Sequence, residues 1–199
     1  PVVGPGLLPT GEPGVEFNNG FVSDAHFQLD NLGYRETSGL DVNYTQYFDE
    51  RSWGALTVLF DLTYLLEFER QASENSPVED LAGDFRYPEL LANARLRWSK
   101  DAWRASLAAR YTSSYDDDPS QRTLEAVGLP TDAEVDVDDW LVWDLNASYD
   151  LTETSFISVN VRNLFDQDPP LVLGSGSNVD LINHSALGRF ITVRLSHGF

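Results

Sequence analysis

The stretch "ALTVLFDLTYLLEF", residues 55–68, alternates apolar and polar side chains at every second position. A period of two is typical of a β-strand that turns one face to an apolar environment and the other to water. Strands in globular proteins usually have about 5–6 residues, whereas a strand that crosses a bilayer needs about 9–11. This stretch is long enough to cross. Its apolar side carries Leu56, Val58, Phe60, Leu62, Tyr64, Leu66 and Phe68.

Six further stretches show the same alternation, and the connections between them alternate in length. The other expected strands are 39–48, 90–98, 103–115, 141–149, 156–165 and 188–199. Short turns are expected at 49–52, 99–102 and 150–154, and long polar loops at 70–87, 116–136 and 166–187. Short turns at one rim and long loops at the other are the layout of an outer-membrane barrel. We therefore expect an all-β fold, a transmembrane antiparallel β-barrel.

The charged residues of these strands all fall on the polar side of the alternation. A Lys or Arg that faces lipid at the bilayer midplane costs about 2–4 kcal/mol. Aromatic residues gather near the strand ends, as they do at membrane interfaces. Both patterns support a sheet that faces lipid with its apolar side. The charged positions are Asp41, Asp61, Glu67, Arg95, Arg97, Arg104, Arg110, Asp144, Arg162 and Arg194.

The composition excludes several other classes of protein. The formal net charge of -19 argues against nucleic acid as a partner, because phosphates need a basic surface. No run approaches the roughly 18 apolar residues of a membrane helix. Cysteine is absent, so disulfides and thiolate metal sites are excluded. Methionine is also absent, so residue 1 is not an initiator and we expect the chain to continue upstream.

Three stretches carry a resemblance to a known family: "VNVRNLFDQDPP" at 159–170, the closing "LGRFITVRLSHGF" at 187–199, and "NLGYRETSGLDVNY" at 31–44. Together they resemble the C-terminal β-barrel part of a TonB-dependent outer-membrane receptor. The resemblance implies that this chain supplies about seven to eight long strands of a larger barrel with about 22 strands. Residues 1–33 would be an extracellular loop or partial strand, and 34–199 the C-terminal portion of the barrel. The chain would be roughly the last third or less of the receptor.

The resemblance also implies a function and a set of partners. Such receptors lie in the outer membrane of Gram-negative bacteria and import a scarce nutrient such as a ferric siderophore, a cobalamin or an oligosaccharide. The TonB energy-transducing complex would act through an N-terminal part that this chain lacks, and lipid and lipopolysaccharide would surround the barrel. The barrel-assembly machinery would read the terminal strand, although His197 stands where a tyrosine is commoner. The residues of this assembly signal would be Ile191, Val193, Leu195 and Phe199.

Arginines on the polar side would line the interior of a family member, around its plug. We expect them to pair with plug carboxylates and with Asp41, Asp61 and Asp144. The competing interpretation is a pathway for anionic ligands. The arginines are Arg95, Arg97, Arg104, Arg110, Arg162 and Arg194.

Acidic residues before the strand at 141–149 are the other candidate site. If that strand extends upward, Glu134, Asp136 and Asp138 share the lumen-facing side and form an acidic ladder at the vestibule. A solvated acidic loop is favoured over a calcium or cationic-ligand site, because the run lacks the EF-hand pattern. The triplet "NHS" at 183–185 is interpreted as a polar loop, since a catalytic set must converge in space. We expect no enzyme activity, cofactor or metal.

Two other classes of protein stay open at this point. One is a complete eight-stranded barrel that serves as an anchor or adhesin, with a further strand in 15–31 and pairing between first and last strands. The other is a soluble acidic β-sandwich that binds carbohydrate or calcium.

Overall fold

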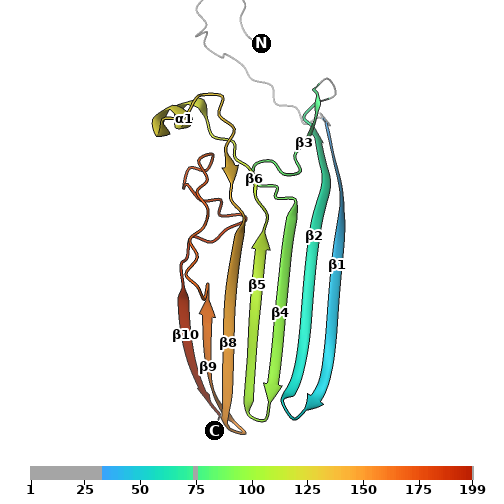
Figure 1. Cartoon of the computed structure of the whole chain (residues 1–199), viewed down its shortest axis with the longest axis vertical. Coiled ribbons are helices and arrows are strands. Elements are labelled where there is room, and N and C mark those ends of the chain that lie inside the picture. The colour runs from blue at the N-terminus through green and yellow to red at the C-terminus, as the bar shows by residue number, and fades with distance from the viewer. Residues whose placement is uncertain (1–32, 74–75, 199) are drawn as a thin grey trace, which may run out of the picture. The chain divides into compact units, whose positions relative to one another are not determined.

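The computed structural model describes residues 33–73 and 76–198. Seven long antiparallel strands follow one another in a single sheet, in chain order (Figure 1). They are β1 (Tyr34–Arg51), β2 (Gly54–Gln71), β4 (Leu90–Lys100), β5 (Trp103–Thr112), β8 (Trp140–Thr152), β9 (Ser155–Arg162) and β10 (Phe190–His197). This arrangement confirms the expected antiparallel barrel fold, seen here as an open part of a barrel.

The remaining elements are short and lie beside the ends of the long strands. The strand β3 (Val78–Asp80) pairs with β2, and β6 (Tyr115–Asp116) pairs with β7 (Asp136–Val137). The helix α1 (Gln121–Val127) has seven residues, with Ser120 as its N-cap and Gly128 as its C-cap. No helix in the described part of the chain is long and apolar enough to span a membrane.

The register between strands separates an apolar face from a polar face. One row of paired residues crosses the sheet as Phe48, Leu56, Trp98, Ala105, Ala147, Val159 and Val193. The adjacent row crosses it as Tyr47, Thr57, Arg97, Ser106, Asn146, Asn160 and Thr192. Because neighbouring residues of a strand point to opposite faces, the two rows define the two faces.

No described element covers the apolar face of this sheet. Leu96 is 44% exposed, Trp103 52% and Val193 63%. The small packed core lies instead among the long connections, where Tyr115, Val137 and Val172 pack together. A soluble sandwich would bury its apolar face against a second sheet, and the described residues contain only the two-stranded β6–β7 pair besides this sheet.

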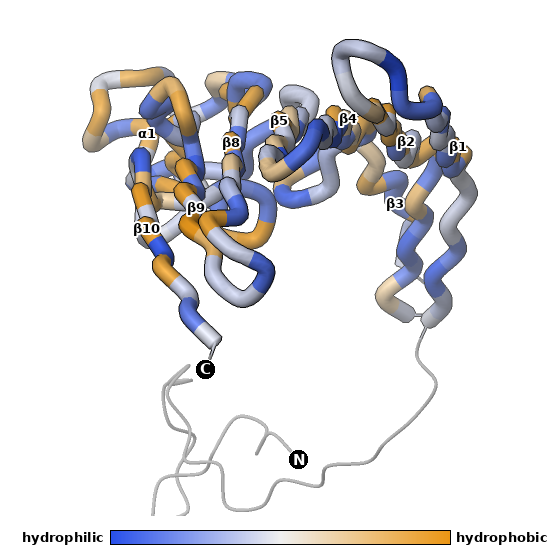
Figure 2. The backbone as a smooth tube through the Cα atoms, turned by 90° about the horizontal axis from the view of Figure 1, so that it is seen from below, coloured by the Kyte–Doolittle hydropathy of each residue, from blue (hydrophilic) through white to orange (hydrophobic). Residues whose placement is uncertain are grey.

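The connections alternate in length as expected. Tight turns join β1 to β2, β4 to β5 and β8 to β9 at one end of the sheet, and the long connections lie at the other end (Figure 1). The sheet curves from β1 to β10 (Figure 2), as the twist of paired strands requires. At its edges, β1 pairs with β2 alone and β10 with β9 alone among the described residues. The pairing of first and last strands expected of a small barrel would involve the strand at 15–31, which lies outside the described residues.

Three strands are shorter than the sequence pattern predicts. β5 ends at Thr112 and β9 at Arg162. The chain leaves β9 because Asn163 has a φ of 51° and donates its backbone N–H to the Asp144 carboxylate at 2.9 Å. β10 begins at Phe190, after Arg189 has donated its backbone N–H to Asp166 at 2.6 Å. A carboxylate of β8 and one of the β9–β10 connection thus take over backbone N–H groups that the strands would otherwise use.

The first two strands are the longest, with 18 residues each. A β-bulge lies between Ser38 and Gly39. Gly39 approaches its partner strand so closely that a Cβ atom there would lie 2.7 Å from the carbonyl oxygen of Tyr64. Glycine is the residue that permits this approach. Residues 1–32, with the expected extracellular loop and the additional strand at 15–31, lie outside the described residues.

Candidate functional site

Two of the six predicted arginines form ion pairs on the polar face. The guanidinium of Arg110 in β5 lies 3.2 Å from the carboxylate of Asp144 in β8. Arg110 is paired directly with Val142, and Asp144 is two residues further along β8. Arg104 forms an ion pair with Asp150 of the same strand pair. Both pairs are partly exposed, so each contributes little to stability. They hold the two guanidinium groups at fixed places on this face.

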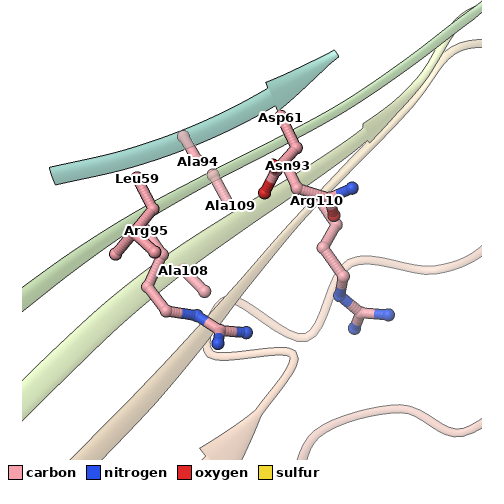
Figure 3. Close-up of a pocket in the computed structure, with 8 residues that line it drawn as sticks. All are labelled: Leu59, Asp61, Asn93, Ala94, Arg95, Ala108, Ala109 and Arg110. Carbon is pink, nitrogen blue, oxygen red and sulfur yellow. The ribbon is translucent and has the colours of Figure 1, made fainter. Parts of the chain in front are cut away.

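A shallow hollow of about 170 Å³ lies on the polar face between β2, β4 and β5. Its lining includes Asp61, Asn93, Arg95 and Arg110. Figure 3 shows the long side chains of Arg95 and Arg110 extending from the sheet toward the same side. The hollow therefore carries two cationic groups, one of which has Asp144 as a partner outside the hollow.

The other predicted arginines have no carboxylate partner in the described part of the chain. Arg95, Arg97 and Arg162 form no ion pair there. The guanidinium of Arg194 lies 6.0 Å from the ring centroid of Phe156, within the range of a cation–π contact. Of the expected carboxylate partners, Asp41 accepts a hydrogen bond from Thr63 at 2.6 Å instead. The role of the six arginines at a plug or in an anion pathway stays a prediction.

The described residues of the predicted assembly signal lie on the apolar face. Ile191, Val193 and Leu195 pair with Val161, Val159 and Ile157 of β9. The three are exposed by 59%, 63% and 70%. Phe199 lies outside the described residues. Recognition of this strand by the barrel-assembly machinery stays a prediction.

The acidic residues of the predicted vestibule ladder do not continue β8. That strand begins at Trp140, whereas Asp136 belongs to β7 and pairs with Asp116 of β6. Glu134, Asp136 and Asp138 are all exposed. Within residues 33–73 and 76–198, no three His, Cys, Asp or Glu side chains lie close enough to hold a metal ion. A vestibule role for the acidic ladder stays a prediction.

A buried carboxylate is the main feature of the long loops. The side chain of Asp180 is fully buried and accepts hydrogen bonds from the Tyr115 hydroxyl at 2.9 Å, the Asn183 amide at 2.7 Å and the Ile182 backbone N–H at 3.0 Å. The Arg86 guanidinium lies 3.9 Å away. Burial alone would raise the pKa of Asp180, but these hydrogen bonds outweigh burial and hold its pKa below the usual value. Asp180 is therefore an ionised group in the loop interior at neutral pH.

His184 lies beside this carboxylate, between two aromatic rings. It is 5% exposed, stacks on Tyr115 with ring centroids 5.9 Å apart and meets Trp140 edge-on at 5.3 Å. Neither ring nitrogen has a hydrogen-bond partner in the described part of the protein. Burial lowers the pKa of His184, and the charge of Asp180 offsets this only in part. The imidazole is thus held neutral.

The sequence interpretation of "NHS" as a polar loop missed this cluster. Asn183 and His184 lie in the interior of the loops, against Asp180 and Tyr115. Tyr115 and Asp180 are 65 residues apart in the chain. The loops between strands have no repeating pattern from which such a contact could be deduced.

Comparison with known proteins identifies the class of this sheet. A family model described as "TonB dependent receptor-like, beta-barrel" matches residues 7–164. A mutant of the ferric enterobactin receptor of Pseudomonas aeruginosa has a similar structure, with a TM-score of 0.50 and 15% sequence identity. The match covers 82% of this chain and 22% of that chain. The likeness therefore shows only that this chain has the fold of a part of that receptor. No curated protein matches.

A curved antiparallel sheet with one uncovered apolar face, one charged face, and loops that alternate between short and long defines a transmembrane β-barrel. The family match adds the kind of barrel. The chain belongs to the TonB-dependent receptor-like β-barrel family, a family of outer-membrane receptors rather than of enzymes.

Proposed function

We propose that this chain forms the C-terminal barrel portion of an outer-membrane receptor that imports a scarce nutrient into a Gram-negative bacterium. The observation that supports the proposal most directly is the pair of rows across seven strands, one apolar and uncovered, the other polar with Arg97 in it. Lipid covers the first face in this proposal, and the second lines the lumen. Energy would come from the TonB complex through a part of the receptor outside this chain.

The nutrient belongs to one of three chemical classes in this proposal: a ferric siderophore, a cobalamin or an oligosaccharide. The similar solved structure is a receptor for ferric enterobactin, but at 15% identity it supports the fold and leaves these classes open. Ligand residues would lie on the long loops and on the plug. The barrel-assembly machinery would insert the receptor after reading its terminal strand.

Uptake measurements test this function. The gene that encodes the chain is deleted in its source bacterium, and accumulation of radiolabelled ferric siderophores, cobalamin and malto-oligosaccharides is measured with and without a protonophore. We expect the deletion to abolish energy-dependent accumulation of one class and the restored gene to recover it. Unchanged accumulation of all three classes would contradict the proposal.

A charge reversal on the polar face tests the proposed plug contacts. Arg95→Glu with Arg97→Glu in the full-length receptor replaces two cations by two anions, which would repel plug carboxylates. We expect the variant to admit a large antibiotic such as vancomycin, measured as a lower inhibitory concentration. Arg122→Glu on α1, away from the polar face, is the control and is expected to leave the permeability unchanged.

Unchanged permeability in the double variant would exclude the plug contacts. If uptake of an anionic ferric siderophore fell at the same time, the competing proposal of an anion pathway along these arginines would be favoured.

A further inference from the structure

The three long connections of the sheet meet in one packed unit, which we call the cap. The cap consists of the described residues of 72–89, 113–139 and 163–189. Its apolar core takes one or more side chains from each connection: Phe85 from the first, Tyr115 and Val137 from the second, and Val172 from the third. Val137 and Val172 are fully buried. Loops that extended separately into water would leave these side chains exposed.

Hydrogen bonds join the second connection to both of the others. The backbone N–H of Asp116 donates to the carbonyl oxygen of Gly83 in the first connection at 2.7 Å. The carboxylate of Asp117 accepts the backbone N–H groups of Leu173 and Gly174 in the third, at 2.6 and 3.0 Å. A Cβ atom on Gly174 would lie 2.6 Å from that carboxylate, so the glycine allows the close approach.

The first and third connections are also joined directly. The side-chain amide of Asn183 donates to the backbone carbonyl of Arg86 at 3.1 Å, and the Arg86 guanidinium faces Asp180 at 3.9 Å. Since Asp180 also accepts a hydrogen bond from the Tyr115 hydroxyl, a single buried carboxylate contacts all three connections. Removing it would leave buried polar groups without a partner, which is costly in a protein interior.

We propose that the three long connections open and close as one body, fastened at Asp180, and that none of them moves as an independent flap. The cap would then act as a single lid at the loop end of the barrel. A ligand that contacts one connection changes the population of the whole cap, because coupled elements share one equilibrium. This coupling goes beyond the proposed transport function, and its test needs no ligand.

Hydrogen exchange in the full-length receptor in lipid nanodiscs tests the coupling. The variant is Asp180→Ala, and the readout is the exchange rate of amides in each of the three connections. We expect exchange to accelerate roughly tenfold or more in all three, since the variant removes one shared fastener from a single opening equilibrium. Amides of β4 and β5 are expected to keep their rates, which shows that the sheet remains folded.

The matched control is Asp168→Ala on the same connection. The carboxylate of Asp168 is exposed and has no hydrogen bond or ion pair among the described residues. We expect this variant to exchange like the wild type. If Asp180→Ala accelerated exchange only in 163–189 and left the other two connections unchanged, the proposal of one body would be overturned.

A milder variant covers the case in which Asp180→Ala prevents folding. Tyr115→Phe removes only the hydroxyl that donates to Asp180 and keeps the ring in the apolar core. We expect a smaller acceleration, about two- to tenfold, again in all three connections. Acceleration confined to 113–139 would contradict the coupling, because a thermodynamic coupling between connections is reciprocal.

Discussion

Val159→Arg is expected to lower the stability of the membrane-inserted receptor by about 2–4 kcal/mol, whereas Asn160→Arg is expected to change it by much less. The two positions are neighbours on β9 and lie in the apolar and the polar row of the sheet. An arginine at the first position faces lipid, and its charge has no water or carboxylate to contact. At the second it joins a face that already carries arginines.

The measurement is unfolding of both variants and the wild type of the full-length receptor by guanidinium chloride in lipid vesicles. Heat-modifiable migration on gels gives an independent check of the folded fraction. Equal loss of stability in the two variants would show that the faces are not distinguished as the register indicates. A larger loss in Asn160→Arg would show that the two faces have been assigned the wrong way round.

The second large effect is an opening of the cap in acid, through His184. The neutral imidazole lies between Tyr115 and Trp140, with Asp180 as its charged neighbour, and the Arg86 guanidinium lies 3.9 Å from that carboxylate. Its pKa is lowered by burial in the closed cap, so the closed state resists protonation while the open state has the ordinary value of about 6.5. The neutral His184 therefore stabilises the closed cap fully above this pH, and that stabilisation is lost as the pH falls below it. The opening constant then rises by up to about tenfold per pH unit.

Hydrogen-exchange protection factors of cap amides, corrected for intrinsic rates, measure this effect at about pH 7 and about pH 5. The control is His184→Phe, which keeps a ring between Tyr115 and Trp140 but cannot take up a proton. We expect protection to fall with pH in the wild type and to be nearly constant in the variant. Equal slopes in the two proteins would contradict the role of His184.

Three carboxylates of the cap have shifted pKa values, but they do not mimic this result. Backbone hydrogen bonds lower the pKa of Asp80, and the pKa of Asp180 is also lowered overall, so the contributions of both are lost only below the ordinary value of about 3.9. Burial, and then repulsion from Asp116, raise the pKa of Asp84. The closed state therefore binds a proton at Asp84 more readily than the open state does, so protonation of Asp84 favours the closed cap as the pH falls. Asp84 is the same in the wild type and in His184→Phe, so its effect cancels in the comparison.

The sheet could be predicted from the sequence because one physical requirement repeats along it. Every second side chain must suit lipid, so the order, spacing and faces of the strands follow from the alternation. The ion pair of Arg110 with Asp144 could be predicted from the same alternation, since diagonal neighbours on adjacent strands lie close enough for long side chains to meet. Strand ends were less predictable, because the backbone N–H of Asn163 bonds to Asp144 of β8 and that of Arg189 to Asp166 of a loop.

The cap could not be predicted, because its contacts are not periodic. Tyr115 meets Asp180 across 65 residues of chain, and the aromatic cage of His184 takes one ring from β6 and another from β8. In the sequence, Asp117 belongs to a run of three aspartates with the composition of a solvated loop, and only the fold shows that it binds two backbone N–H groups. Composition describes the solvation of a loop, whereas its packing depends on which loops the strands bring together.

The bulge at Ser38 and Gly39 marks a level above which the β1–β2 hairpin changes character. Beyond it most of the paired residues are charged or polar, including Glu36 opposite Glu69 and Arg35 opposite Arg70, and the exception is Phe68 opposite Thr37. At about 3.3 Å per residue, these 18-residue strands are roughly 60 Å long, well over what an apolar band about 25 Å tall requires even when tilted. The outer end of the hairpin is therefore expected to extend beyond the membrane as ordered, water-exposed backbone among the lipopolysaccharide sugars. An antibody or phage fibre would contact this ordered hairpin before it reached the membrane.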